Sequence, residues 1–111
     1  MKRIEAIIRP HRQADVLAAL AKMQISGVTV LDTLGLGRQP GHSEVYEEVR
    51  HSSELETGLI RKRLLLMFVE DEHVQAVVDT IVRTASTGVP GDGKIAVSGI
   101  DQLIRIRANG E

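Results

Sequence analysis

Hydrophobic and polar residues follow a pattern that divides the chain into two similar halves. In the first half, a two-residue alternation closed by Pro10 predicts a half-buried strand with core residues Ile4, Ala6 and Ile8. A helical spacing that stops at Gly27 then predicts a helix with core residues Val16, Leu20 and Met23. The β-branched start of residues 28–36 predicts a second strand.

The second half repeats this order of elements. Residues 64–69 form a continuous apolar run of strand length, which is typical of a central strand buried on both faces. The acidic residues 70–72 lie where the dipole of a following helix favours negative charge. Gly88 is expected just past the end of that helix, and Ile95 begins a fourth predicted strand. The helix core stripe is Val74, Val77, Val78, Ile81 and Ala85.

Two β-α-β units of this size predict an α+β fold, a ferredoxin-like βαββαβ sandwich with its four strands in one sheet and both helices on one face. A different arrangement of the same elements stays open on pattern alone. By length, residues 1–111 form a single domain. Ile7 lies on the strand face opposite Ile4 and Ile8, which suggests that another subunit covers the open face of the sheet.

Residues 37–60, between the two halves, are polar and show no sustained periodicity. Loops of this length in small domains are usually functional or disordered. We interpret this segment as a flexible effector loop between strands 2 and 3 that contacts another protein.

Composition excludes several classes of partner. The chain of 111 residues has no cysteine, one tyrosine, one phenylalanine and a formal net charge of −1. Few aromatic residues count against RNA or single-strand binding, and the near-neutral charge counts against a polyanion surface. No apolar run is long enough to span a bilayer, and the N-terminus lacks the shape of a signal peptide. We expect a cytoplasmic protein with no nucleic-acid partner and no direct membrane insertion.

The glycine-rich residues 88–94 match the first seven positions of a phosphate-binding P-loop, but Ile95 replaces the Ser or Thr that would hold magnesium. The order of elements is also reversed, because a helix precedes these glycines and a strand follows them. The segment still favours an anion site in which Lys94 reaches phosphates. Arg105 and Arg107, spaced by two, would form a clamp in an extended chain, although a solvated basic strand has the same pattern.

Two other classes of function stay open on these residues. A small phosphate-transferring or ATP-hydrolysing enzyme would need a base or nucleophile, and no spacing identifies one. A metal-responsive ferredoxin-like trimer could use His42 and His51 with nearby glutamates, although solvent-exposed histidines explain the same residues without fixed ligand spacing.

The chain resembles the PII-type nitrogen regulatory (signal-transduction) proteins over nearly its whole length. The segments that carry this resemblance run in family order, and the pair Gly-Arg-Gln-x-Gly-His and Gly-Asp-Gly-Lys-Ile is specific. They are residues 1–10, 27–30, 35–39, 41–46, 87–88, 91–98 and 104–107.

The resemblance implies a non-enzymatic homotrimer of ferredoxin-like subunits with ATP or ADP in the clefts between neighbours. Such proteins sense adenylate and often 2-oxoglutarate. They signal through a long loop, the T-loop, that docks on an unidentified enzyme, transporter or regulator, here in nitrogen or related metabolism.

Site residues carry over by position. Gly91, Asp92, Gly93 and Lys94 would hold phosphates, and Arg105 and Arg107 would reach them from a neighbouring subunit. Thr29 would lie by the adenine, Gln39 would ligate Mg²⁺ when ATP and 2-oxoglutarate bind together, and Lys62 would pair with 2-oxoglutarate. The full nucleotide-binding set is Thr29, Gly37, Arg38, Gln39, Thr87, Gly88, Gly91, Asp92, Gly93, Lys94, Arg105 and Arg107.

The chain also departs from the family pattern. His51 stands where many members carry a modifiable tyrosine, so uridylylation at that position is chemically impossible. Val89 and Pro90 replace a more typical Lys-Ile pair, and Leu64 and Leu66 occupy strand positions that are often charged. These departures indicate an atypical branch, in which nucleotide binding is expected more firmly than 2-oxoglutarate sensing.

Overall fold

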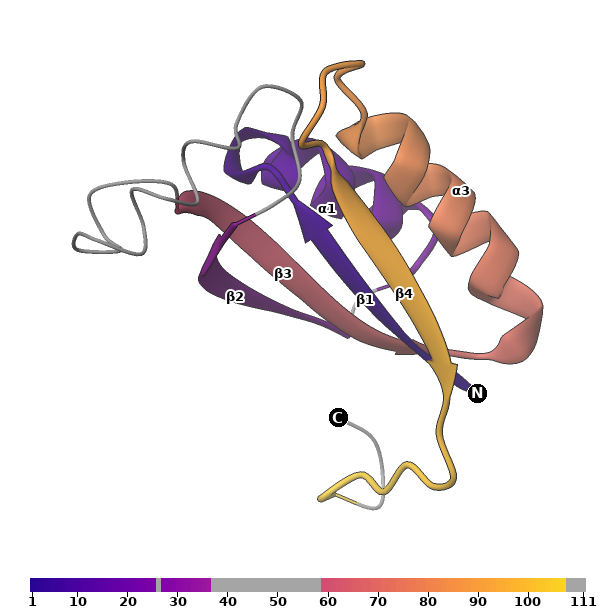
Figure 1. The fold of residues 1–111 in the computed structure, drawn as a ribbon. Coiled ribbons are helices and arrows are strands. Elements are labelled where there is room, and N and C mark those ends of the chain that lie inside the picture. Colours follow the sequence, from indigo (N-terminus) through magenta and orange to yellow (C-terminus); the bar gives the residue numbers. More distant parts are fainter. Residues whose placement is uncertain (26, 37–58, 108–111) are drawn as a thin grey trace.

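The computed structural model describes residues 1–25, 27–36 and 59–107 (Figure 1). The strands and helices, with two short 3-10 turns, run in the order expected from the sequence. They are β1 (Lys2–Ile8), η1 (Pro10–Arg12), α1 (Gln13–Lys22), β2 (Val28–Gly35), β3 (Ile60–Val69), η2 (Asp71–His73), α3 (Val74–Ala85) and β4 (Gly93–Gly99).

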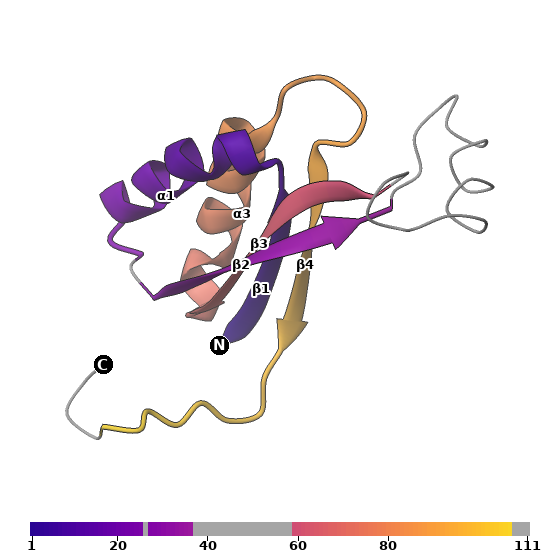
Figure 2. The same ribbon diagram turned by 90° about the vertical axis from the view of Figure 1, so that its left-hand side faces the viewer.

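The four strands form one antiparallel sheet in the order β2-β3-β1-β4. Both helices lie on the same face of this sheet, which Figure 2 shows from the side. The predicted α+β class is therefore confirmed, and the strand order and helix placement are consistent with the ferredoxin-like arrangement. β1 is central, because it pairs with β3 along one edge and with β4 along the other.

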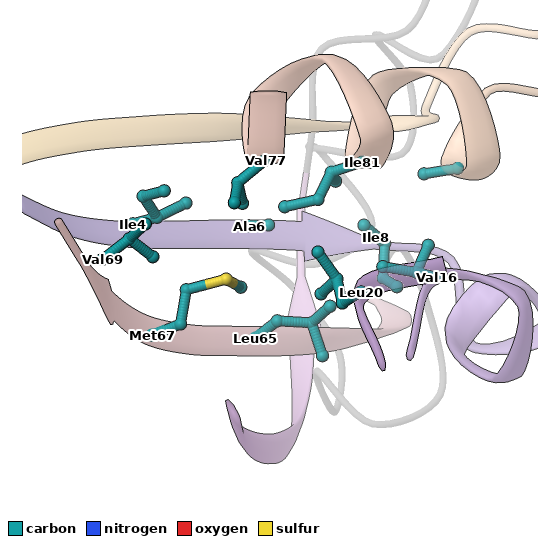
Figure 3. Packing of buried hydrophobic residues seen from close by; sticks show 11 residues of the cluster. Ile4, Ala6, Ile8, Val16, Leu20, Leu65, Met67, Val69, Val77 and Ile81 are labelled. Carbon is teal, nitrogen blue, oxygen red and sulfur yellow. The ribbon is translucent and has the colours of Figure 1, made fainter. Parts of the chain in front are cut away.

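The core lies between the helices and one face of the sheet (Figure 3). The alternation of β1 is confirmed, since its even-numbered apolar residues are buried and its odd-numbered residues are not. Helix α3 buries three of the predicted stripe residues, and Val74 and Val78 pack at the margin. The buried apolar residues are Ile4, Ala6, Ile8, Val16, Leu20, Leu65, Met67, Val69, Val77, Ile81 and Ala85.

Strand β3 differs from its prediction. Its apolar run indicates burial on both faces, but only the residues facing the helices are buried: Leu65, Met67 and Val69. Leu64 and Leu66 are half-buried, and Phe68 is 41% exposed. The reason is that both helices cover the same face, so a single chain leaves its other face open, with these apolar side chains beside Arg3 and Glu5.

Three predicted boundaries also shift. Helix α3 ends at Ala85 and Ser86 is already extended, so Gly88 lies within a turn and is not the residue just past the helix. The fourth strand begins at Gly93 rather than Ile95. Ile60 already belongs to β3, and residues 37–58 of the predicted loop lie outside the described residues.

Gly93 is required by the fold. Its φ angle is +122°, and a Cβ atom there would lie 1.8 Å from the carbonyl oxygen of Ile7. The contact arises because β1 and β4 pair with Gly93 directly opposite Ile8. Only glycine allows this backbone conformation and this close approach together.

We predict that Gly93→Ala lowers the free energy of unfolding by more than about 3 kcal/mol, because a positive-φ cost adds to a clash with backbone that cannot move aside. Gly88→Ala is the matched control. Gly88 also has positive φ (+83°), but a Cβ there meets no atom within 4 Å, so its cost is only about 1–2 kcal/mol. Urea denaturation of both variants measures the difference, and equal losses would contradict the proposed clash.

Candidate functional site

The glycine turn, residues 87–93, connects α3 to β4 at one end of the sheet (Figure 1, orange). It lies where β1 ends and β3 begins, because Ile8 pairs with both Arg63 and Gly93. Gly88, Gly91 and Gly93 all have positive φ. The concentration of glycines in the sequence therefore corresponds to a turn that residues with side chains would adopt only under strain.

The carboxylate of Asp92 is turned into the glycine turn. Its Oδ2 accepts hydrogen bonds from the backbone N–H groups of Thr87 (2.8 Å) and Gly88 (3.0 Å). Its Oδ1 accepts one from the Thr87 hydroxyl, whose oxygen in turn accepts the N–H of Val89 at 3.2 Å. These bonds, led by that of the Thr87 hydroxyl, hold the pKa of Asp92 well below its ordinary value. The carboxylate thus organises the turn from within.

Arg9 fastens the turn to the sheet. Its Nε lies 3.1 Å from Asp92 Oδ1, and its Nη2 donates to the Pro90 carbonyl at 2.7 Å and more weakly to the Val89 carbonyl at 3.4 Å. Sequence reasoning did not identify Arg9 as a site residue. The available signal was its place directly before Pro10 at the end of a predicted strand, but only the strand register puts it beside Asp92.

Lys62 is the second cation on the turn. Its ammonium donates a hydrogen bond to the Gly91 carbonyl. Burial, followed by the nearby charge of Arg9, lowers the pKa of Lys62, and Asp92 partly opposes this effect.

Strand alternation distinguishes Lys62 from its two basic neighbours. Arg61 and Arg63 pair with Asp32 of β2 at 2.8 and 2.7 Å, and Arg63 also donates to Gln13 of α1. Lys62, the residue that the resemblance assigns to the effector, instead donates to the Gly91 carbonyl of the glycine turn.

Lys94 follows the turn as the second residue of β4, where it is exposed and paired with Ile7. A cleft of about 370 Å³ opens beside it between α3 and β4. The cleft wall is mostly apolar, with Ser86, Asp92 and Lys94 as polar residues. Three glycines with positive φ and the exposed ammonium of Lys94 are compatible with the anion site predicted from the sequence.

The remaining described site residues lie away from the glycine turn: Arg105 and Arg107 follow the far end of β4, and Thr29 lies on the opposite edge strand, level with the middle of β1. Thr29 is exposed on β2, paired with Leu66. Arg105 lines a second cleft of about 350 Å³ with Gly27, Phe68, Glu70 and others. Residues 100–107 leave β4 at the end remote from the glycine turn (Figure 1, yellow). A seven-residue strand separates the two ends by roughly 20 Å, so one chain does not bring Arg105 to Lys94.

The clamp of Arg105 and Arg107 stays a prediction. In the part of the chain that the structure describes, residues 101–107 form no strand, and residues 106 and 107 lie in a bend. Gly37, Arg38 and Gln39 lie outside the described residues, as do His42 and His51. Within residues 1–25, 27–36 and 59–107, no group of three or more His, Cys, Asp or Glu side chains could hold a metal ion.

Comparison with known proteins shows which family the chain belongs to. The sequence model of the family described as "Nitrogen regulatory protein P-II" matches residues 1–110. "Nitrogen regulatory protein P-II 1" of Escherichia coli (strain K12) is 44% identical over 111 residues, which covers 100% of this chain and 96% of that protein. The "Nitrogen regulatory protein P-II" of Porphyra purpurea is 44% identical and that of Pyropia yezoensis is 43% identical, each over 109 residues, 98% of this chain and 94% of the relative.

The class of protein defined by fold, site and similarity is a signal-transduction regulator and not an enzyme. The chain belongs to the nitrogen regulatory protein P-II family. Proteins of this family bind adenine nucleotides and act in nitrogen metabolism. Among the described residues, no helix is long and apolar enough to cross a membrane.

We predict a pH dependence for the glycine turn. The folded-state pKa of Asp92 is below its ordinary value of 3.8, so the stability it contributes is present above that value and is lost as pH falls through the lower, folded pKa. Urea denaturation of wild type and Asp92→Asn should therefore show a stability difference that is constant near neutral pH and shrinks below about pH 4.

Comparing wild type with Asp92→Asn isolates the contribution of Asp92 to the pH dependence of stability from those of the other acidic groups. The pKa of Asp71 is also lowered, chiefly by a hydrogen bond from the N-terminal amine. Asp71 is present in both proteins, so its contribution cancels in the stability difference. A stability difference that stays unchanged through this acid range would contradict the assigned role of the Asp92 carboxylate.

Proposed function

We propose that the chain is a homotrimeric regulator that binds ATP or ADP in clefts between subunits and controls a partner protein through residues 37–60. The observation that supports this most directly is the separation of the anion-binding groups. Lys94 and the glycine turn lie at one end of the sheet, whereas Arg105 lies near the other end and Thr29 lies on β2, the edge strand opposite β4. A head-to-tail ring places one end of a subunit beside the other end of its neighbour, and a ring closes without leaving a free interface.

The open face of the sheet supports the same assembly. Ile7, Leu64, Leu66 and Phe68 occupy this face together with the ion pair of Arg3 and Glu5, and Phe68 is 41% exposed. Apolar side chains exposed on a sheet face are stabilised when a second layer covers them. Further copies of the chain would supply that layer.

Roles in the proposed site follow the chemistry of each group. The backbone of Gly91, Asp92 and Gly93 and the ammonium of Lys94 would hold phosphates, which accept charge-assisted hydrogen bonds. Arg105 and Arg107 would reach the same phosphates from the neighbouring subunit, and Thr29 would lie beside the adenine. The site would be completed by Thr87 and Gly88 of the turn and by Gly37, Arg38 and Gln39.

The proposal also includes sensing of 2-oxoglutarate. Lys62 would pair with a carboxylate of the effector, and Gln39 would ligate Mg²⁺ held with ATP. Because the Lys62 ammonium already donates to the Gly91 carbonyl, an effector carboxylate would compete with the glycine turn for this cation. The link between Lys62 and the turn offers a physical route by which the effector and the phosphates affect each other.

Calorimetry with ATP and ADP tests nucleotide binding. Lys94→Ala should weaken ATP binding by about 1.5–3 kcal/mol, the usual size of a hydrogen bond to a charged group. Lys22→Ala, which removes an exposed lysine at the end of α1, is the control and should bind as wild type does. A folded trimer that binds neither nucleotide would refute the proposal, and sustained ATP turnover abolished by Lys94→Ala would favour an enzyme instead.

Mixed trimers test the location of the site between subunits. Lys94→Ala and Arg105→Ala trimers should each bind ATP weakly, because every cleft lacks one group. Co-expression of the two variants should restore tight sites, since some clefts then combine an intact turn from one subunit with an intact Arg105 from the next. Failure of the mixture to recover any tight site would place both residues in one subunit's site, and tight binding by the Arg105→Ala trimer alone would exclude Arg105.

A pull-down tests control through the loop. A variant with residues 42–57 replaced by a short Gly/Ser linker should keep its trimeric mass and its ATP affinity but lose partner proteins that wild type captures in a nucleotide-dependent way. Capture of the same partners by this variant would show that another surface docks them.

A further inference from the structure

Three successive carbonyl groups of the glycine turn point toward cations from the sheet. The carbonyls of Val89 and Pro90 accept from Arg9, and the carbonyl of Gly91 accepts from Lys62. Arg9 also holds Asp92, and Asp92 holds the start of the turn at Thr87 and Gly88. The turn is thus fastened along its length by one carboxylate and two cations.

This arrangement sets the direction of two N–H groups. The described peptide bonds are all trans. In a planar trans peptide the carbonyl and the following N–H point in opposite directions. The Pro90 and Gly91 carbonyls face Arg9 and Lys62, so the N–H groups of Gly91 and Asp92 point away from those cations. In a turn fixed in this way, both N–H donors already have a set direction before a phosphate binds, so binding does not have to order them.

Substitution of Asp92 can separate the effect of turn geometry on phosphate binding from the effect of charge. A carboxylate beside a phosphate site repels the phosphate by simple electrostatics. Asp92 is nevertheless turned inward, where both of its oxygens are used by Thr87, Gly88 and Arg9. Its side chain is 28% exposed and that of Arg9 is 22% exposed, so solvent screens this pair less than a fully exposed one.

We propose that Arg9 and Asp92 form a latch that presets the glycine turn for phosphate binding, with Arg9 as a positioning residue rather than a phosphate ligand. This inference rests on the proposed nucleotide site. The latch requires the guanidinium fork, because one group donates from Nε to Asp92 and from Nη2 to the Pro90 carbonyl. A lysine carries the same charge but cannot reproduce this planar, two-armed contact.

The test compares variants for which charge and geometry predict different results. Asp92→Asn removes a negative charge, so electrostatics alone predicts tighter ATP binding. The asparagine side chain has one acceptor oxygen and one NH₂ group. Whichever way the amide is oriented, the NH₂ group would face hydrogen-bond donors that a carboxylate oxygen accepts in wild type. The latch therefore predicts weaker ATP binding, by about tenfold or more. Arg9→Lys keeps the charge and should also weaken ATP about tenfold, whereas a purely electrostatic Arg9 would be replaced without loss.

The measurements are ATP calorimetry and amide NMR spectra of the full-length trimer. Loss of the latch should shift and broaden the amide signals of Gly91 and Asp92 in the ATP-free protein, an effect that a change in overall stability would not confine to the turn. Asp79→Asn, which neutralises an exposed carboxylate on α3, changes the net charge as Asp92→Asn does and should match wild type in both measurements.

The outcomes separate the latch from the proposed function. Absence of ATP binding by wild type would overturn both. Wild-type binding together with equal or tighter binding by Asp92→Asn would overturn only the latch. If Asp92→Asn fails to assemble, Arg9→Lys decides the question, because full ATP affinity in that variant would equally exclude the latch.

Discussion

The candidate site depends on the pairing of β1 with β4, in which the backbone of Ile7 passes so close to Gly93 that no Cβ atom fits. This contact fixes the register that sets Ile8 opposite Gly93, and Arg9 and Asp92 follow directly from it. The same strand pairs with β3 and brings Lys62 to the turn. A constraint on the fold therefore assembles the cations around the glycine turn.

In the proposed assembly, one chain would present two incomplete halves of a site. The half at the glycine turn would offer donors for phosphate and a cation, whereas the half near Gly27 and Arg105 has a cleft lined by both apolar and charged residues. Both would lie on a scaffold whose second sheet face is uncovered and carries apolar side chains such as Phe68 beside Arg3 and Glu5. Association would bury this face and complete the site at once, so nucleotide occupancy and assembly are expected to be thermodynamically linked.

Patterns in the sequence predicted much of the fold because burial has the period of the secondary structure. Alternation identified Ile4, Ala6 and Ile8, and helical spacing identified Val77 and Ile81. The same reasoning predicted that β3 is buried on both faces. An apolar run does not reveal whether the layer that covers its second face comes from the same chain. For the candidate site, residue type pointed to Lys94 and the glycines, whose role in binding stays a prediction. The pairing of Arg9 with Asp92 was missed because it depends on the register of strands over 80 residues apart.

The most direct test of this account is a crystal structure of the chain with bound ATP. We expect the phosphates to contact the backbone of residues 91–93 and Lys94 of one subunit and Arg105 of the next, with the Asp92 carboxylate still turned toward Thr87 and Arg9. A nucleotide whose phosphate contacts all come from one subunit, or which binds away from the glycine turn, would contradict the central claim that the site is formed between subunits.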